Sequence, residues 1–175
     1  MARKRETYWH ALKVFNRNVP YMQDLFRDAR YETYYPMMIE ERMGGGSIEY
    51  VKKPIVPSLL FVKCPGKFLD NLKRSMLTDR FMYYAGDDRM PGNIPDKEME
   101  DFIRATSIYE PGTMYLGNDT AKYAVGDRVR VTDGIYKGLE GYVKRIRHAR
   151  RFVVCVTGVT AVAISDIHPQ FLEKI

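Results

Sequence analysis

The densest group of side chains able to bind a polyanion lies in one short stretch near the C-terminal end. Six basic side chains crowd a predicted hairpin there: Lys144, Arg145, Arg147, His148, Arg150 and Arg151. Guanidinium and ammonium groups in such number hold phosphates with an affinity that ignores base sequence and falls with salt. They could also bind an acidic protein, or only keep an edge hairpin soluble. The residues leave these three readings open.

Groups that would carry catalysis or bind a metal are scattered. His10, His148 and His168 are dispersed, and neither Cys64 nor Cys155 has a neighbour at metal-ligand spacing. The glycine run at 44–46 lacks the lysine and the strand-to-helix context of a phosphate-binding loop. We therefore expect no enzyme activity, no metal and no cofactor. The two cysteines are expected to be buried, unpaired thiols of a reducing compartment.

The element that must hold the basic hairpin is an unusual arc at 125–143. Val129 and Val131 alternate with polar residues, which is typical of a strand with one buried face. Asp133 ends this alternation, and three glycines follow at short intervals: Gly134, Gly138 and Gly141. Because glycine accepts positive φ and close backbone approach, the pattern predicts a tight arc followed by a return strand.

Composition is that of a globular protein with a basic surface. The chain has 175 residues, of which 45% are hydrophobic and 29% charged, enough for one large domain or two small ones. A net charge of +6 favours a polyanionic neighbour. No stretch has the pattern of a signal peptide or the length of a transmembrane segment, so we expect a cytoplasmic protein without membrane contact.

Strands and amphipathic helices alternate in the first two thirds of the chain. Strands are predicted at 9–15, on both sides of the glycine run at 44–46, and at 59–62, where a continuous apolar run predicts a central strand covered on both faces. Helices are predicted from Pro20, at 68–76 and from Pro95. This order predicts an α+β sandwich with helices against an antiparallel sheet. After a segment without periodicity and the arc, three short strands predict a small all-β barrel.

The arc resembles the KOW motif, with matches at Val129, Val131, Asp133, Gly134, Tyr136, Gly138, Gly141 and Val143, and with Ile135 where the motif has proline. The stretch at 56–62 is similar to an aromatic-Pro-Gly-Tyr motif, although only Pro57, Phe61 and Val62 match. Together these features resemble the NusG family, including its UpxY-like and RfaH-like members. The resemblance implies a ferredoxin-like α/β sandwich (NGN domain) at 1–108, a linker at 109–124 and an SH3-like KOW barrel at 125–175.

The resemblance also implies a function in transcription. The first domain would bind the clamp helices of RNA polymerase through an apolar depression, bridge the cleft and suppress pausing or termination, for capsular or surface polysaccharide operons in the specialised members. The residues expected in the depression are Phe15, Val56, Leu59 and Phe61. An exposed apolar pocket ringed by charges suits an amphipathic partner helix. The alternative is that these side chains fill the core of their own domain.

A second surface implied by the resemblance contacts the non-template DNA strand of the transcription bubble. The residues expected on it are Asn16, Arg17, Gln23, Lys73, Arg74 and Ser75. Arg and Lys would hold phosphates, whereas Asn and Gln could read an unstacked base, but each residue could instead belong to a solvated helix face.

In relatives the KOW barrel recruits Rho or a ribosomal protein, although 157–160 lacks an obvious aromatic for that contact. We expect a monomer whose KOW domain stays a barrel, because its last strands are strongly β-prone. The alternative function is an RNA- or ribosome-binding KOW protein, which would bind RNA without polymerase.

Overall fold

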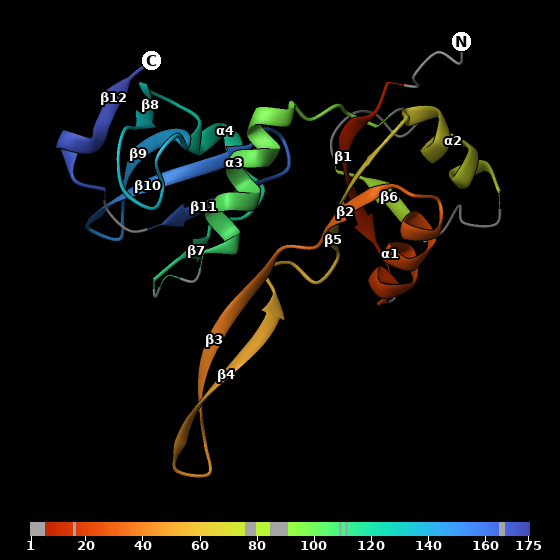
Figure 1. Cartoon of the computed structure of the whole chain (residues 1–175), viewed down its shortest axis with the longest axis horizontal. Helices are drawn as coiled ribbons and strands as arrows, with labels where there is room; N and C mark the ends of the chain where they lie inside the picture. Colours follow the sequence, from red (N-terminus) through yellow and green to blue (C-terminus); the bar gives the residue numbers. More distant parts are fainter. Residues whose placement is uncertain are drawn as a thin grey trace. The chain divides into compact units, whose positions relative to one another are not determined.

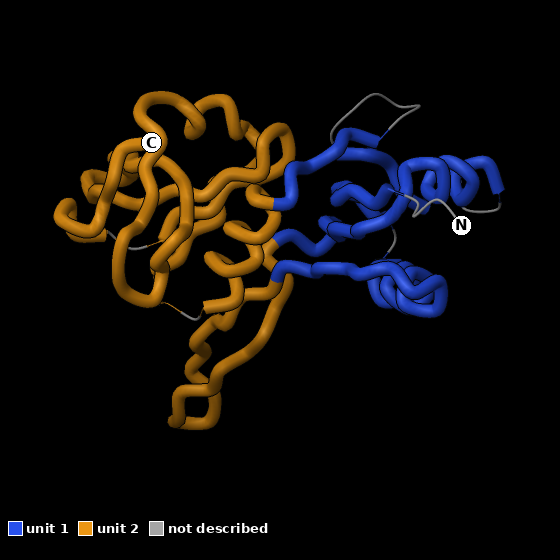
Figure 2. The backbone as a smooth tube through the Cα atoms, turned by 45° about the horizontal axis from the view of Figure 1, so that its top comes forward, with its two compact units in different colours: residues 1–36, 56–96 blue, residues 37–55, 97–175 orange. Residues whose placement is uncertain are grey.

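The structure is a computed structural model that describes residues 6–15, 17–75, 80–84, 91–108, 110, 112–164 and 167–175. The chain divides into two compact units, one formed by residues 1–36 and 56–96 and the other by residues 37–55 and 97–175 (Figure 2). The first unit combines helices with a four-stranded sheet, and the second contains a long hairpin and a six-stranded sheet.

The first unit has the βαββαβ order of the predicted α+β sandwich (Figure 1). Its elements are β1 (Tyr8–Val14), α1 (Val19–Asp28), β2 (Glu32–Tyr34), β5 (Leu59–Cys64), α2 (Gly66–Arg74) and β6 (Phe81–Tyr83). The strands lie in the order β2-β5-β1-β6, and each neighbouring pair is antiparallel. The predictions of a first strand and of a central strand at 59–62 are confirmed, since β5 lies between β1 and β2 and is buried except at Lys63.

Both helices of the first unit pack on the same face of its sheet. The shared core joins Leu12, Leu60 and Val62 of the strands to Met22 and Phe26 of α1 and Leu69 of α2. The rings of Phe26 and Phe68 have centroids 6.2 Å apart, which brings the two helices side by side. Pro20 occupies the first turn of α1, where its missing N–H breaks no helical hydrogen bond. The predicted helical periodicity is therefore confirmed for α1 and α2.

A long hairpin is formed by β3 (Met37–Gly44) and β4 (Ser47–Pro54). The strands pair from Met37 and Pro54 down to Gly44 and Ser47, and Gly45 and Gly46 form the turn with φ of 56° and 87°. The strand predicted before the glycine run, which would include the aromatic segment at 31–39, is instead divided between β2 and β3. Pro36 lies in the interruption, and proline cannot donate the hydrogen bond that a continuous strand needs.

The second unit contains a six-stranded sheet in the order β12-β8-β9-β10-β11-β7. Its elements are α3 (Asp96–Ser107, within the unit from Lys97), β7 (Met114–Tyr115), α4 (Thr120–Tyr123), β8 (Arg128–Val131), β9 (Glu140–Ile146), β10 (Ala149–Val156), β11 (Thr160–Ile164), η1 (Pro169–Phe171) and β12 (Leu172–Lys174). The predicted third helix and the three strands after the arc are confirmed.

The predicted linker at 109–124 contains regular structure in its described residues, and its role as a linker stays a prediction. The segment contributes β7, which pairs with β11, and α4. Met114, Leu116 and Tyr123 pack against the core of Val153, Cys155, Ala161 and Ala163. Since this order comes from pairing with a distant strand, local periodicity gave no sign of it. The contacts also group residues 97–107 of α3 with the second unit, and the domain boundary expected at 108 stays a prediction.

The arc between β8 and β9 has the conformations that its glycines suggest. Gly134 and Gly138 have φ of 83° and 86°, and the N–H of Gly138 donates to the carbonyl of Val131 at 2.7 Å. Gly141 is required for space rather than for its φ, because a Cβ there would lie 2.3 Å from the carbonyl oxygen of Val153. Tyr136 and Leu139 are buried, while Ile135, in the place of the motif's proline, is exposed. The arc is closed by its own hydrogen bonds.

Two further sequence expectations concern the cysteines and membrane-spanning helices. Cys64 and Cys155 are both buried and free, as expected. Across the described ranges, the structure has no helix with the length and apolar character that crossing a bilayer requires.

Candidate functional site

The four apolar residues expected in a depression do not share one environment. Leu59 is 1% exposed and Phe61 is fully buried, so the expectation that they form an accessible surface is wrong. The physical reason is that β5 is the central strand whose two faces are both covered, as the apolar run itself indicated. Phe15 and Val56 are half-buried and keep some accessible surface.

Phe15 and Val56 are brought close by the backbone around them. The N–H of Val14 donates to the carbonyl of Ser58 at 2.7 Å, which joins the end of β1 to the loop before β5. Tyr35 extends this neighbourhood, because its hydroxyl donates to the carbonyl of Pro57 at 2.9 Å. These two bonds link the segments that carry Phe15, Val56, Tyr35 and Pro57, hereafter the apolar rim.

The polar residues expected to contact DNA are distributed over two helices of the first unit. Arg17 is exposed just before α1, with φ of 57°, and Asn16 lies outside the described residues. At the end of α2, Lys73 lies 4.5 Å from the centroid of the Tyr83 ring and Arg74 forms an ion pair with Asp70 at 3.0 Å. The Ser75 hydroxyl donates to the carbonyl of Leu72, so this residue also caps the helix.

Two exposed side chains that sequence reasoning missed lie near Phe15. The guanidinium of Arg80 is 5.2 Å from the centroid of the Tyr21 ring, a cation–π distance, and Tyr21 is 49% exposed. The N–H of Phe15 donates to the carbonyl of Arg80 at 2.8 Å. Pairing of β6 with β1 places the residue before β6 beside the residue after β1. Had the sequence analysis predicted this antiparallel pair, it would have placed Arg80 next to Phe15.

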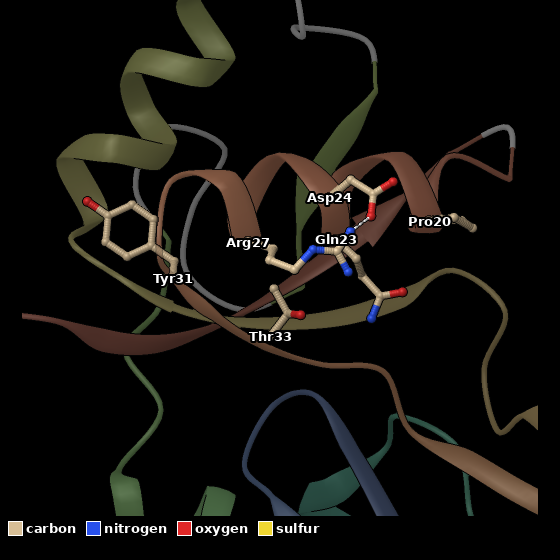
Figure 3. Close-up of a pocket in the computed structure, with 6 residues that line it drawn as sticks. All are labelled: Pro20, Gln23, Asp24, Arg27, Tyr31 and Thr33. Carbon is tan, nitrogen blue, oxygen red and sulfur yellow. Dashed lines mark hydrogen bonds and ion pairs between the residues drawn. The ribbon is translucent and has the colours of Figure 1, made fainter.

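Gln23 lines a shallow polar pocket of about 320 Å³ between α1 and β2. The lining residues are Pro20, Gln23, Asp24, Arg27, Tyr31 and Thr33. Figure 3 shows Gln23 and Arg27 extending from α1 toward Thr33, with Arg27 ion-paired to Asp24. Asp24 and Arg27 have opposite charges, so the charged side chains that line the pocket sum to zero and offer no surplus positive charge for a phosphate.

Helix α3 is attached to the arc of the second unit by polar contacts. Lys97 donates to the carbonyl of Gly138 at 2.9 Å and Arg104 to the carbonyl of Lys137 at 2.8 Å. Asp101 accepts from Lys97 at 2.7 Å and from the N–H of Glu140 at 3.3 Å. Burial raises the pKa of the Asp101 carboxyl, and the contact with Lys97 opposes that rise. The arc is therefore held by this helix as well as by its own turns.

The β10–β11 turn, where the KOW contact of relatives was sought, is also engaged within the chain. Glu98 of α3 accepts from both the N–H and the hydroxyl of Thr157 at 3.0 Å. The hydroxyl of Thr120 accepts from the N–H of Gly158 at 2.8 Å. A partner at this turn would have to replace these bonds.

The basic hairpin is the β9–β10 turn, and its six basic side chains are not equivalent. Three of them donate to backbone carbonyls of other segments: Lys144 to Val125, Arg150 to Ile167 and Arg151 to Gly112. Arg145, Arg147 and His148 are exposed at the end of the hairpin. The structure thus separates basic side chains that bond to other segments from basic side chains that face solvent.

Potential metal ligands are dispersed in the part of the chain that the structure describes. Among the described residues, no group of three or more His, Cys, Asp or Glu side chains converges as metal ligands would. His10 is fully buried in the first unit, with its ring nitrogens 3.0 Å and 3.1 Å from the carbonyl oxygens of Gly92 and Cys64. Burial lowers the pKa of His10, although the two carbonyls oppose that change. Its surroundings are those of a structural histidine.

Of the comparisons with known proteins, the one with solved structures gives matches. No family model matches the chain. No curated protein matches it either. Among solved structures it is similar to one described as domain interaction in Thermotoga maritima NusG, with a TM-score of 0.44, 18% identity and coverage of 97% of each chain. A TM-score this low supports no inference about function.

Proposed function

We propose that this protein is a transcription elongation or antitermination factor that binds RNA polymerase and carries out no chemistry of its own. The observation that carries the proposal is the arc: the sequence that resembles a KOW motif has positive φ at Gly134 and Gly138 and a close backbone approach at Gly141. The βαββαβ order of the first unit agrees with the α/β sandwich that the same resemblance implies for the N-terminal domain.

The polymerase contact is proposed at the apolar rim, without Leu59 and Phe61. Phe15 and Val56 flank the bond between Val14 and Ser58, and cations surround them: Lys13 lies 6.0 Å from the Phe15 ring centroid, and Arg80 is bonded to Phe15 through its backbone. A small apolar surface bordered by positive charge suits an amphipathic helix with an acidic flank. In this proposal the partner helix belongs to the polymerase clamp.

Contact with the non-template DNA strand is proposed for Arg17, Lys73 and Arg74, with Arg80 added by the structure. These cations belong to one unit whose two helices lie side by side, and a single strand could follow them through its phosphates. Bridging of the polymerase cleft would then suppress pausing. Rho or a ribosomal protein, if recruited at the β10–β11 turn, would compete with Glu98 for Thr157.

Substitution of the apolar rim tests the polymerase contact. Val56→Asp should abolish co-purification with RNA polymerase, because a charge would be desolvated against an apolar helix, a cost of several kcal/mol (roughly 2–5). Val125→Asp is the matched control, since Val125 is 60% exposed and lies in the other unit. Circular dichroism checks that both variants fold. Undiminished recovery of polymerase by folded Val56→Asp would refute this contact.

The DNA contact has a separate test. Arg17→Gln with Arg74→Gln should weaken suppression of pausing in a transcription assay while leaving polymerase recovery unchanged. Each lost phosphate contact should also lower the salt dependence of binding to single-stranded DNA by a slope of roughly 0.7. Equal loss of polymerase binding and pause suppression would argue against two separate surfaces.

The second candidate is an RNA- or ribosome-binding KOW protein. The observation that favours it is the surplus of exposed cations on the β9–β10 hairpin. Recovery of ribosomes without polymerase from the same pull-down would replace the first proposal by this one.

A further inference from the structure

The β9–β10 turn keeps two side chains in backbone conformations that favour glycine. Arg147 and His148 form a two-residue turn between Ile146 and Ala149, with φ of 49° and 67°. A two-residue hairpin with both φ values positive is most stable with Asn-Gly, and other residues there carry a conformational cost. Arg147 and His148 therefore occupy backbone conformations that cost conformational free energy for residues with a side chain.

The strands that lead to this turn oppose like charges. Arg145 lies directly across from Arg150, and Lys144 directly across from Arg151. Like charges in facing positions of an antiparallel pair destabilise it. The sequence has no Asp or Glu between positions 141 and 164 to offset them. The end of the hairpin therefore combines strained turn residues with like charges in facing positions.

Only part of this charge is used within the chain. Lys144, Arg150 and Arg151 donate to backbone carbonyls, as described above. Arg145, Arg147 and His148 make no hydrogen bond, ion pair or ring contact with any residue that the structure describes. These three residues, hereafter the basic tip, are free to bind a ligand.

We propose that the basic tip binds the phosphate backbone of a nucleic acid strand. Guanidinium groups fit phosphate oxygens in a bidentate manner, and Arg145 and Arg147, two residues apart at the end of the hairpin, can contact adjacent phosphates. An acidic protein is the less suitable partner, because protein interfaces depend on buried apolar or aromatic anchors. The exposed neighbour of the tip on β10 is Ala149, which supplies no such anchor.

The test uses the full chain and two fluorescent 20-nucleotide probes of the same sequence, single-stranded RNA and single-stranded DNA. The variant combines Arg145→Gln, Arg147→Asn and His148→Gly. Binding to at least one probe should weaken about tenfold at 50 mM salt, and the slope of log affinity against log salt should fall by roughly 1.5 as two phosphate contacts are lost. Because Asn-Gly suits this turn, thermal stability should be unchanged or higher. The probe that loses affinity identifies the strand.

The matched control is Lys122→Gln with Lys137→Gln, which removes two formal positive charges from other exposed positions of the same unit. It should leave binding nearly unchanged. Equal weakening in the control would overturn the proposal in favour of diffuse net charge. Full binding by the stable tip variant would also overturn it, leaving the tip as a solubility device. So would equal competition by a glutamate-rich peptide of the same charge. The polymerase recovery of the tip variant is a separate result, so this proposal and the proposed function can fail independently.

Discussion

The two long hairpins of this protein have turns of the same length but differ in their turn residues and in the charges that face each other across the strands. Both β3–β4 and β9–β10 turn through two residues with positive φ, Gly45-Gly46 in the first and Arg147-His148 in the second. Across the strands, the first hairpin pairs Arg42 with Glu49, whereas the second pairs Arg145 with Arg150. The first hairpin thus follows local preferences that the second contradicts.

The difference suggests where each hairpin is constrained. The β3–β4 hairpin forms its own two-stranded sheet and must be stable through its turn and its strand pairs. The β9–β10 hairpin is part of a six-stranded sheet whose core includes Phe152, Val153 and Val154, all at most 1% exposed. That core can support an unfavourable turn, so the end of the hairpin is available for binding.

The largest expected effect on stability is at Gly141, a strand glycine of the second hairpin, and Gly44 is its counterpart in the first. Gly141→Ala should destabilise the second unit by about 3 kcal/mol, because its Cβ would lie 2.3 Å from a backbone oxygen and 3.0 Å from the Phe152 ring. Gly44→Ala should cost less than about 0.5 kcal/mol, because its Cβ meets only the flexible end of Glu49 at 2.8 Å. Urea denaturation measures both. Similar losses would show that the barrel strands are as adaptable as the isolated hairpin.

The turns themselves should respond in opposite directions. Gly46→Ala should destabilise the β3–β4 hairpin by about 1 kcal/mol, since Gly46 has φ of 87° and nothing within 4 Å restricts it otherwise. His148→Gly should stabilise the second unit by up to about 1 kcal/mol for the same reason. Amide hydrogen exchange follows the first change and thermal unfolding the second. A loss of stability in His148→Gly would mean that its ring makes a favourable contact within the fold.

The sequence predicted elements whose determinants are local. The glycine spacing of the arc, the proline at the start of α1 and the apolar run of β5 all act within a few residues, and all three predictions are confirmed. The error about Leu59 and Phe61 came from treating motif positions as surface although the apolar run indicated a strand covered on both faces. A motif gives no information about which face of a strand is accessible.

Features determined by distant contacts could not be predicted. The role of Arg151 depends on the carbonyl of Gly112, which is 39 residues away, and no pattern near either residue indicates that bond. The same applies to Glu98, which contacts Thr157 across 59 residues. The sequence therefore identified a cluster of six basic side chains but not which of them bond to other segments of the chain. That division decides which residues form the basic tip.

The smallest expected effect concerns the facing charges near each turn. Arg145→Glu should stabilise the second unit by roughly 0.5 kcal/mol, because it places an opposite charge across from Arg150. Glu49→Arg should destabilise the β3–β4 hairpin by a similar amount, because it places a like charge across from Arg42. Both effects should shrink in 1 M salt, where the Debye length falls to about 3 Å. Thermal unfolding of Arg145→Glu and amide exchange of Glu49→Arg, each at low and high salt, measure them. Effects that persist at high salt would have to come from packing, and the charge contrast between the two hairpins would then lose its electrostatic basis.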